Sequence, residues 1–138
     1  MRLLIDSNIL LDVLQAREAH YMPSYAIWKS CEKGYADGYI SSLTFANIVY
    51  IMRKQLRYDE IDTLLWNIKN AFYFVGLKLS EFEAAADMKW CDFEDAVQSA
   101  TASRIHADYI ITRNTNDYAG SSVRAITPEE YFAEVFTV

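Results

Sequence analysis

Acidic side chains that could hold a metal ion stand at comparable places along this chain. Asp6 ends the apolar run Leu3 to Ile5, Asp117 follows a second apolar run, and Asp92 and Asp95 precede a run of small residues. Positions i and i+3 share a helix face, so Asp92 and Asp95 can point the same way. Oxygen ligands of this type suit Mg²⁺ or Mn²⁺ rather than zinc. Such ions activate water for attack on a phosphodiester.

Each of these carboxylates also has an ordinary structural interpretation. Asp6 and Asp92 are well placed to cap helices, and Asp117 could stabilise a turn through a bond to the backbone. The residues alone leave both interpretations open. A metal site is favoured only if the carboxylates meet at one edge of the fold.

The elements that would bring them together are short apolar strands alternating with amphipathic helices. We expect strands at residues 3–5, 39–40, 72–75, 109–111 and 123–126. This alternation predicts an α/β fold with a parallel sheet and helices on both faces. Ligands of such sheets bind at the carboxyl edge of the strands, where Asp6 and Asp117 would lie.

Helix boundaries are marked by caps and by apolar spacing. Residues 59–70 show the i, i+3, i+4, i+7 pattern of a surface helix. Capping boxes are expected at Ser80–Glu83 and at Thr127–Glu130, where proline also occupies the first helical position. Ser41 or Ser42 can cap a further helix that carries Asn47 in its early turns.

Composition bounds the class of protein. With 138 residues and 52% hydrophobic content, we expect one domain spanning residues 1–138. The two cysteines do not make a disulfide framework, and Asp6 interrupts the N-terminal apolar run, so we expect a cytoplasmic protein with no membrane span.

The net charge of −6 gives little general attraction to phosphate, so a nucleic-acid role needs a metal or a local basic surface. Arg53, Lys54 and Arg57 form the clearest basic group. They either stabilise the C-terminus of a helix or contact phosphate. Phosphate-cradling glycine motifs are absent from the sequence.

Three segments together resemble the PIN-domain family. Ile5–Leu10 resembles the opening of these domains, and Asp92–Gln98 resembles the helix that carries their third acid. Ala107–Asn114, followed by Asp117 and Tyr118, resembles a segment near their C-terminal end. Order, spacing and length all agree with the family over essentially the whole chain.

The resemblance implies a three-layer α/β/α fold around a central parallel sheet. It implies a Mg²⁺- or Mn²⁺-dependent ribonuclease that cleaves RNA to leave a 5′-phosphate and a 3′-hydroxyl. Many members of this size are VapC-like toxins, which are usually homodimers held inactive by a cognate antitoxin protein. An unrelated flavodoxin-like regulatory domain is a more distant interpretation of the same alternation.

The resemblance also implies roles for particular residues. Metal ligands would include Asp6 and Asp95, with Asp117 as the last acid and Asn114 as its competitor. Asn8 would orient a carboxylate or a water molecule. The remaining implied roles belong to one segment, in which Thr112 and Asn114 shape the rim of the site and Arg113 meets a phosphate.

One position departs from the family pattern. The family commonly has a glutamate in the helix after the second strand, where this sequence has Asn47. An amide oxygen can bind a hard cation but brings no charge. Asp92 could compensate because it shares a helix face with Asp95. The alternative is a catalytically weakened PIN-fold module that binds RNA or protein.

Overall fold

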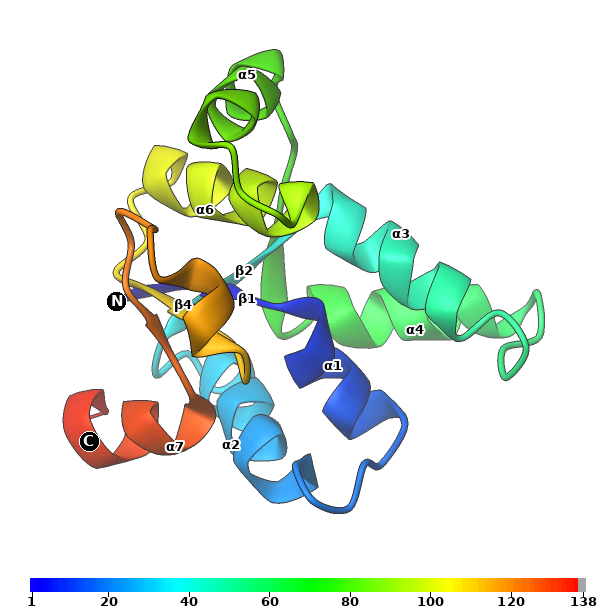
Figure 1. The fold of residues 1–138 in the computed structure, drawn as a ribbon. Helices are drawn as coiled ribbons and strands as arrows, with labels where there is room; N and C mark the ends of the chain where they lie inside the picture. Colours follow the sequence, from blue (N-terminus) through cyan, green and yellow to red (C-terminus); the bar gives the residue numbers. More distant parts are fainter. Residues whose placement is uncertain (137–138) are drawn as a thin grey trace.

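A five-stranded parallel sheet runs through the computed structural model, which describes residues 1–136. Its strands lie in the order β3 (Phe72–Val75), β2 (Asp37–Ser41), β1 (Arg2–Ile5), β4 (Tyr109–Ile111) and β5 (Ala125–Ile126). The chain first builds outward from β1 to β3 and then returns to add β4 and β5 on the other side (Figure 1). The strand order therefore reverses between β1 and β4, which is where open sheets form ligand sites.

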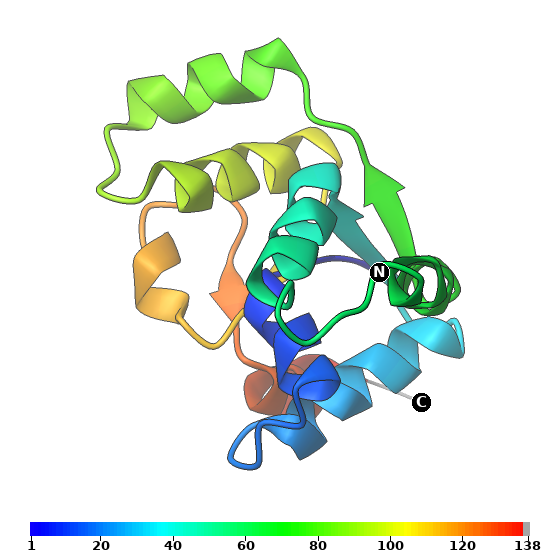
Figure 2. The same cartoon turned by 90° about the vertical axis from the view of Figure 1, so that its right-hand side faces the viewer.

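Helices cover both faces of this sheet (Figures 1 and 2). The helices are α1 (Ser7–Leu14), α2 (Tyr21–Glu32), α3 (Ser42–Ile51), α4 (Glu60–Lys69), α5 (Leu79–Met88), α6 (Phe93–Arg104) and the short α7 (Pro128–Glu130), which continues as a π-type turn over Tyr131–Val135. The arrangement confirms the predicted three-layer α/β/α fold with a central parallel sheet.

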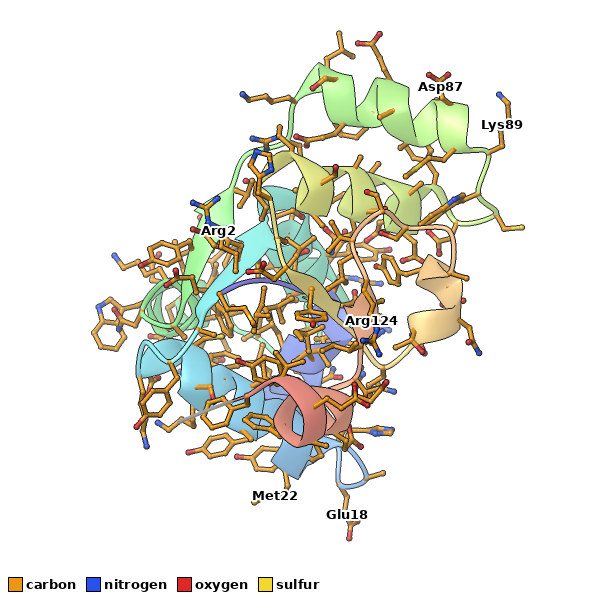
Figure 3. The ribbon with its side chains drawn as sticks, turned by 90° about the vertical axis from the view of Figure 1, so that its left-hand side faces the viewer. Arg2, Glu18, Met22, Asp87, Lys89 and Arg124 are labelled. Atoms are coloured by element: carbon orange, nitrogen blue, oxygen red, sulfur yellow. The ribbon has the colours of Figure 1, made fainter. Side chains whose placement is uncertain are left out.

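The two faces of the sheet have separate cores because side chains alternate along a strand. Leu3 and Ile5 of β1 point into a large core shared with α1, α2, α3, α4 and the C-terminal helix. Leu4 points the other way and packs with Ala102 of α6 and Ile110 of β4. Helix α5 packs on α6 rather than on the sheet, through Ala85. Asp87 lies on the outer side of α5, and Lys89 lies just after the end of this helix (Figure 3).

Most predicted boundaries agree with the structure. The helix predicted at 59–70 is α4, Glu60–Lys69, and β4 coincides with its predicted run. The box at Thr127 is confirmed, since its hydroxyl accepts a hydrogen bond from the backbone N–H of Glu130 at 3.1 Å. The last strand is shorter than predicted and includes only Ala125 and Ile126.

The capping box predicted at Ser80–Glu83 is wrong. The helix starts two positions earlier, and Glu81 accepts a hydrogen bond from the backbone N–H of Lys78 at 3.2 Å. Glu81 is buried and paired with Arg104 of α6, so tertiary contact between the two helices fixes the start of α5.

The basic group after α3 begins beyond the helix rather than within it, because α3 ends at Ile51. Arg53 nevertheless donates a hydrogen bond from Nη1 to the carbonyl oxygen of Tyr50 at 2.7 Å, which satisfies a group at the helix end. None of the helices described in residues 1–136 is long and apolar enough to cross a membrane.

Candidate metal site at the carboxyl edge of the sheet

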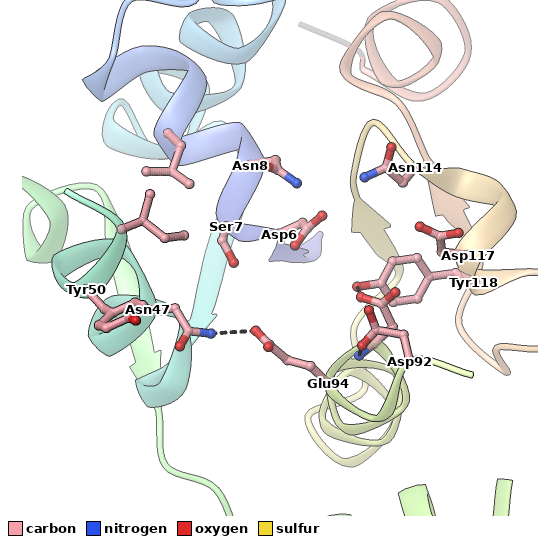
Figure 4. A pocket seen from close by; sticks show the side chains of 13 residues that line it. Asp6, Ser7, Asn8, Asn47, Tyr50, Asp92, Glu94, Asn114, Asp117 and Tyr118 are labelled. Carbon is pink, nitrogen blue, oxygen red and sulfur yellow. Dashed lines mark hydrogen bonds between the residues drawn. The ribbon is translucent and has the colours of Figure 1, made fainter. Parts of the chain in front are cut away.

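Segments far apart in the sequence enclose one cavity of about 440 Å³ at the carboxyl edge of the central strands (Figure 4). The segment after β1, one face of α3, the start of α6 and the segment after β4 all contribute to its wall. Its lining residues are Asp6, Ser7, Asn8, Leu11, Asn47, Tyr50, Ile51, Asp92, Glu94, Asp95, Asn114, Asp117 and Tyr118. The structure thus brings together every carboxylate that the sequence singled out.

Asp6 lies directly after β1, at the position that precedes α1. It occupies the N-cap position but makes no side-chain capping hydrogen bond, which argues against the purely structural interpretation. Its carboxylate accepts a hydrogen bond from the hydroxyl of Thr112 at 2.8 Å. Burial raises the pKa of Asp6, and the hydrogen bond from Thr112 opposes that rise. Asp6 is therefore a carboxylate that lacks full compensation for its burial.

Asp92 and Asp95 lie at the start of α6. Asp92 caps the helix by accepting a hydrogen bond from the backbone N–H of Asp95 at 3.1 Å, so its predicted capping role is confirmed while it also lines the cavity. Asp95 accepts a hydrogen bond from the buried hydroxyl of Tyr118 at 3.2 Å. Desolvation, followed by repulsion from Asp92, raises the pKa of Asp95 to about 6.

Glu94 joins the cavity from the same helical turn, a position that the sequence analysis did not select. Its carboxylate accepts a hydrogen bond from the side-chain amide of Asn47, across the cavity on α3 (Figure 4). Desolvation and the neighbouring Asp92 and Asp6 raise the pKa of Glu94, whereas the Asn47 contact lowers it. Helical spacing gives no sign of this role, because Glu94 lies beside Asp92 rather than one turn away.

Asn47 itself lines the cavity with Asp6 and Asp95, as the alignment of its helix predicted. It contributes no charge of its own, but it holds the charged end of Glu94 next to α3. A carboxylate from α6 thereby reaches the side of the cavity formed by α3.

The segment after β4 supplies Asn114 and Asp117, both of which line the cavity. Asp117 belongs to a short 3-10 turn, η1 (Thr115–Tyr118), and its backbone N–H bonds to the carbonyl oxygen of Asn114 at 3.0 Å. The structure thus keeps both residues as candidates for the last oxygen ligand.

Two neighbours of the cavity differ from the roles that the resemblance implied. Thr112 is fully buried and does not form the rim; it supports Asp6 from beneath. Arg113 does not line the cavity, because its guanidinium makes two hydrogen bonds to buried Asp12, at 2.9 and 3.1 Å. We therefore correct the expected phosphate contact of Arg113 to an ion pair that joins α1 to the segment after β4.

The Asp12 network extends to Asn8. Asp12 also accepts a hydrogen bond from Ser24 of α2 at 2.8 Å, and Arg17 approaches it at 3.5 Å. Arg17 donates to the side-chain oxygen of Asn8 at 3.2 Å. This contact uses one of the two lone pairs on the Asn8 oxygen and leaves the amide NH₂ available to the cavity.

The donor set suits a hard divalent cation in chemical type. The polar side chains of the cavity wall carry carboxylates, amides and hydroxyls, and the wall includes no histidine or cysteine. Within residues 1–136, however, no three acidic, histidine or cysteine side chains are close enough together to hold one ion. Mg²⁺ commonly keeps several waters and binds through one or two carboxylates, so the arrangement fits a partly hydrated ion.

Comparison with known proteins identifies a sequence family and several solved structures with the same fold. A sequence family described as "PIN domain" matches residues 2–116. A toxin–antitoxin complex from Klebsiella pneumoniae aligns with a TM-score of 0.68 at 23% identity, covering 91% of this chain and 96% of that one. VapBC2 from Rickettsia felis, bound to a DNA fragment from its promoter, aligns with a TM-score of 0.70 at 13% identity, covering 92% and 98%.

A third structure, the sarcin–ricin loop cleaving toxin VapC20 from Mycobacterium tuberculosis, has a TM-score of 0.61 at 13% identity, covering 98% of this chain and 96% of that one. At these identities the three structures establish the shared fold. No curated protein sequence matches the chain.

Proposed function

The chain belongs to the PIN-domain family, and from this premise we propose that it is a metal-dependent endoribonuclease, the toxin of a toxin–antitoxin pair. The observation that carries the proposal is the convergence of Asp6, Asp95 and Asp117, from separate segments, on one cavity at the strand-order reversal. Burial, together with repulsion from neighbouring carboxylates, raises the pKa of Asp6 and of Asp95. A cation would relieve that repulsion, which makes the cavity suited to bind one.

In this proposal Asp6, Asp95 and Asp117 would hold a partly hydrated Mg²⁺ or Mn²⁺, either directly or through its bound waters, and Asp92 and Glu94 add negative charge nearby. When bound, such an ion lowers the pKa of water and offsets charge on the phosphodiester. The protein's own contribution is positioning of the carboxylates. RNA cleavage would then leave a 5′-phosphate and a 3′-hydroxyl.

Neighbouring hydroxyls and amides would complete the positioning. Thr112 fixes the direction of the Asp6 carboxylate, and Tyr118 fixes that of Asp95. We assign Asn8 and Asn114, which both line the cavity, to orient water or a phosphate oxygen.

The partners follow from the toxin assignment. Two of the structures with this fold are a toxin–antitoxin complex and the VapBC2 complex bound to promoter DNA, and we propose a cognate antitoxin for this chain by analogy. We further propose that the chain forms a homodimer in solution and acts on cytoplasmic RNA.

A second candidate function is favoured by two observations. Asn47 supplies no charge on the α3 side of the cavity, and no three acids are close enough to hold an ion directly within residues 1–136. The chain would then be a PIN-fold module that binds RNA or protein without cleaving. It would bind RNA with or without a divalent ion and leave it intact.

An RNA cleavage assay with titrated Mg²⁺, Mn²⁺ and EDTA tests the proposal. We expect cleavage that requires the ion and disappears in the Asp95→Asn variant. Asp87→Asn is the matched control, because Asp87 lies on the outer side of α5, away from the cavity (Figure 3). Cleavage that persists in EDTA, or that both variants lose equally, would contradict the proposal.

A further inference from the structure

The wall of the acidic cavity poses an electrostatic problem for an RNA substrate. Five carboxylates line the cavity and no lysine or arginine does. One divalent ion offsets only part of that charge, so a polyanion needs additional attraction close by. Cationic side chains at the border of the cavity could supply that attraction if they are not already paired with a carboxylate.

The C-terminal end of α3 meets this requirement. Asn47, Tyr50 and Ile51 occupy positions i, i+3 and i+4, so they share one helix face, and all three line the cavity. Tyr50 is 64% exposed and Ile51 is 47% exposed. A large aromatic ring thus stands in the cavity wall with much of its surface open to solvent.

Arg53 covers one face of this ring and leaves the other face for a stacked base. Its guanidinium lies 4.1 Å from the centroid of the Tyr50 ring, in a cation–π contact, and its Nη1 also bonds to the Tyr50 carbonyl oxygen. These two contacts fix the ring and the guanidinium relative to each other. A preorganised pair loses less conformational entropy on binding than two free side chains.

The charges of Arg53 and Lys54 are also available. Neither forms an ion pair within the described part of the chain, whereas Arg57 contacts Asp59 and Glu60. Arg113, the other arginine near the site, is occupied by Asp12. Arg53 therefore presents an unpaired charge against the exposed aromatic ring, and the exposed Lys54 follows it directly in the chain.

We propose that Tyr50, Arg53 and Lys54 bind single-stranded RNA at the border of the acidic cavity, with a base stacked on Tyr50 and the phosphates held by the two cations. This deepens the proposed function, on which it rests, by naming residues outside the acidic cluster that bind the RNA. Base faces are accessible only when a strand is unpaired. An exposed aromatic ring beside cationic groups is the arrangement that binds such strands.

Fluorescence anisotropy tests the stacking contact. The probes are an unstructured, fluorescein-labelled adenine–uridine oligonucleotide and a labelled RNA duplex, measured in EDTA so that no metal-dependent cleavage consumes them. Loss of one stacked base costs roughly 5- to 100-fold in affinity. We expect a loss in that range for Tyr50→Leu with the single strand, near-wild-type binding for Tyr50→Trp, and no change with the duplex.

Tyr35→Leu is the matched control for the aromatic change. Tyr35 is 58% exposed and precedes β2, at the opposite edge of the sheet from the cavity. If Tyr50→Leu and Tyr35→Leu both bind the single strand as the wild type does, the stacking proposal is overturned. It is equally overturned if the wild type binds the duplex more tightly than the single strand.

The salt dependence of binding tests the cations separately. Removing one phosphate contact lowers the slope of log affinity against log salt by about 0.7 for a single strand. We expect this change for Arg53→Gln and for Lys54→Gln, but not for Lys33→Gln, which lies just after α2 at the opposite edge. An unchanged slope in both test variants contradicts the phosphate contacts.

The outcomes also separate this inference from the proposed function. If Tyr50 and Arg53 govern single-strand affinity but no divalent ion supports cleavage, the RNA surface stands and the nuclease fails. If the wild type cleaves RNA and the Tyr50→Leu and Arg53→Gln variants cleave it with the same KM, the nuclease proposal stands and the RNA-binding surface is wrong.

Discussion

Replacing Asn47 by glutamate tests how the cavity balances its charges. Asn47 now donates a hydrogen bond to the carboxylate of Glu94 and lowers its pKa. In Asn47→Glu the donor becomes a second carboxylate beside Glu94, within the cavity that Asp6 and Asp95 also line. We expect the metal-free protein to become less stable and its affinity for Mn²⁺ to increase.

The magnitude follows from the geometry of this contact. Two like charges about 4 Å apart repel by about 1 kcal/mol in bulk water and about 4 kcal/mol at an effective dielectric of about 20. Glu94 is exposed, so the lower end applies. Loss of the hydrogen bond adds about 1 kcal/mol, and the better helix propensity of glutamate returns a few tenths, roughly 0.3 kcal/mol.

The net cost is therefore about 2 kcal/mol, which corresponds to a fall in Tm of about 4–8 °C for a chain of this size. The added charge acts in the opposite direction when metal is present. Charge count is a main control on the affinity of oxygen sites for hard cations. A net gain of about 1.4 kcal/mol would tighten Mn²⁺ binding about tenfold.

Differential scanning calorimetry in EDTA and titration calorimetry with Mn²⁺ measure the two effects. The matched control is the double variant Asn47→Glu with Glu94→Gln, which restores a donor–acceptor pair with the charges exchanged between α3 and α6. Its metal-free stability should return close to that of the wild type. The reasoning is refuted if Asn47→Glu leaves Tm unchanged or higher and leaves Mn²⁺ affinity unchanged.

Four further predictions follow from the same contacts. Asp95→Asn should abolish metal-dependent cleavage yet raise the Tm of the metal-free protein, because it removes repulsion while its amide oxygen can still accept from Tyr118; a lower Tm would contradict this. The pKa of Asp95 is raised to about 6, so the native state keeps a proton that the unfolded chain loses above about pH 4. The free energy of unfolding should therefore fall as pH rises from about 4 to 6, and urea unfolding in EDTA measures it. A flat profile, or the same fall in Asp95→Asn, would exclude this cause. Asp12→Asn should lower the free energy of unfolding by about 3 kcal/mol, because it leaves Arg113 without its charged partner. Denaturant titration measures this change, and a loss below about 1 kcal/mol would mean that the Asp12–Arg113 ion pair does not hold α1 to the segment after β4. Light scattering should give the mass of a homodimer, and a monomer mass at working concentrations would reject the dimer.

Most of the central sheet was predictable from the sequence because β1, β3 and β4 contain apolar runs, whereas β2 extends from its predicted Tyr39–Ile40 core into polar residues at both ends. Both neighbours of β1 pair with it in parallel, and β1 is buried on both faces, so Leu3, Leu4 and Ile5 are all apolar. Such continuous runs are visible without a structure. The start of α7 was predictable for a different reason, since the Thr127–Glu130 box is a local arrangement that needs no tertiary contact.

Features that depend on tertiary contact were not predictable. Helix α5 starts two positions before the start predicted from the sequence. Its start is fixed by Glu81, which is buried against Arg104 of the neighbouring helix. Arg113 carries a charge near the site, but its pairing with Asp12 arises only when α1 meets the segment after β4. The sequence therefore could not show whether Arg113 pairs with a carboxylate or contacts a phosphate.

The acidic cavity combines both kinds of information. Asp6 and Asp117 could be placed at the carboxyl edge of the sheet because each follows a predicted strand and parallel strands end together. Glu94 could not, because its role depends on its reach from α6 to Asn47 on α3. A change at Asn47 is therefore a change in how one neutral amide holds a carboxylate supplied by another helix. The single variant and the double variant must therefore be compared. Asn47→Glu adds a carboxylate to the cavity, whereas the double variant keeps the number of carboxylates and moves one from α6 to α3, so their difference separates the effect of adding a charge from the effect of moving it.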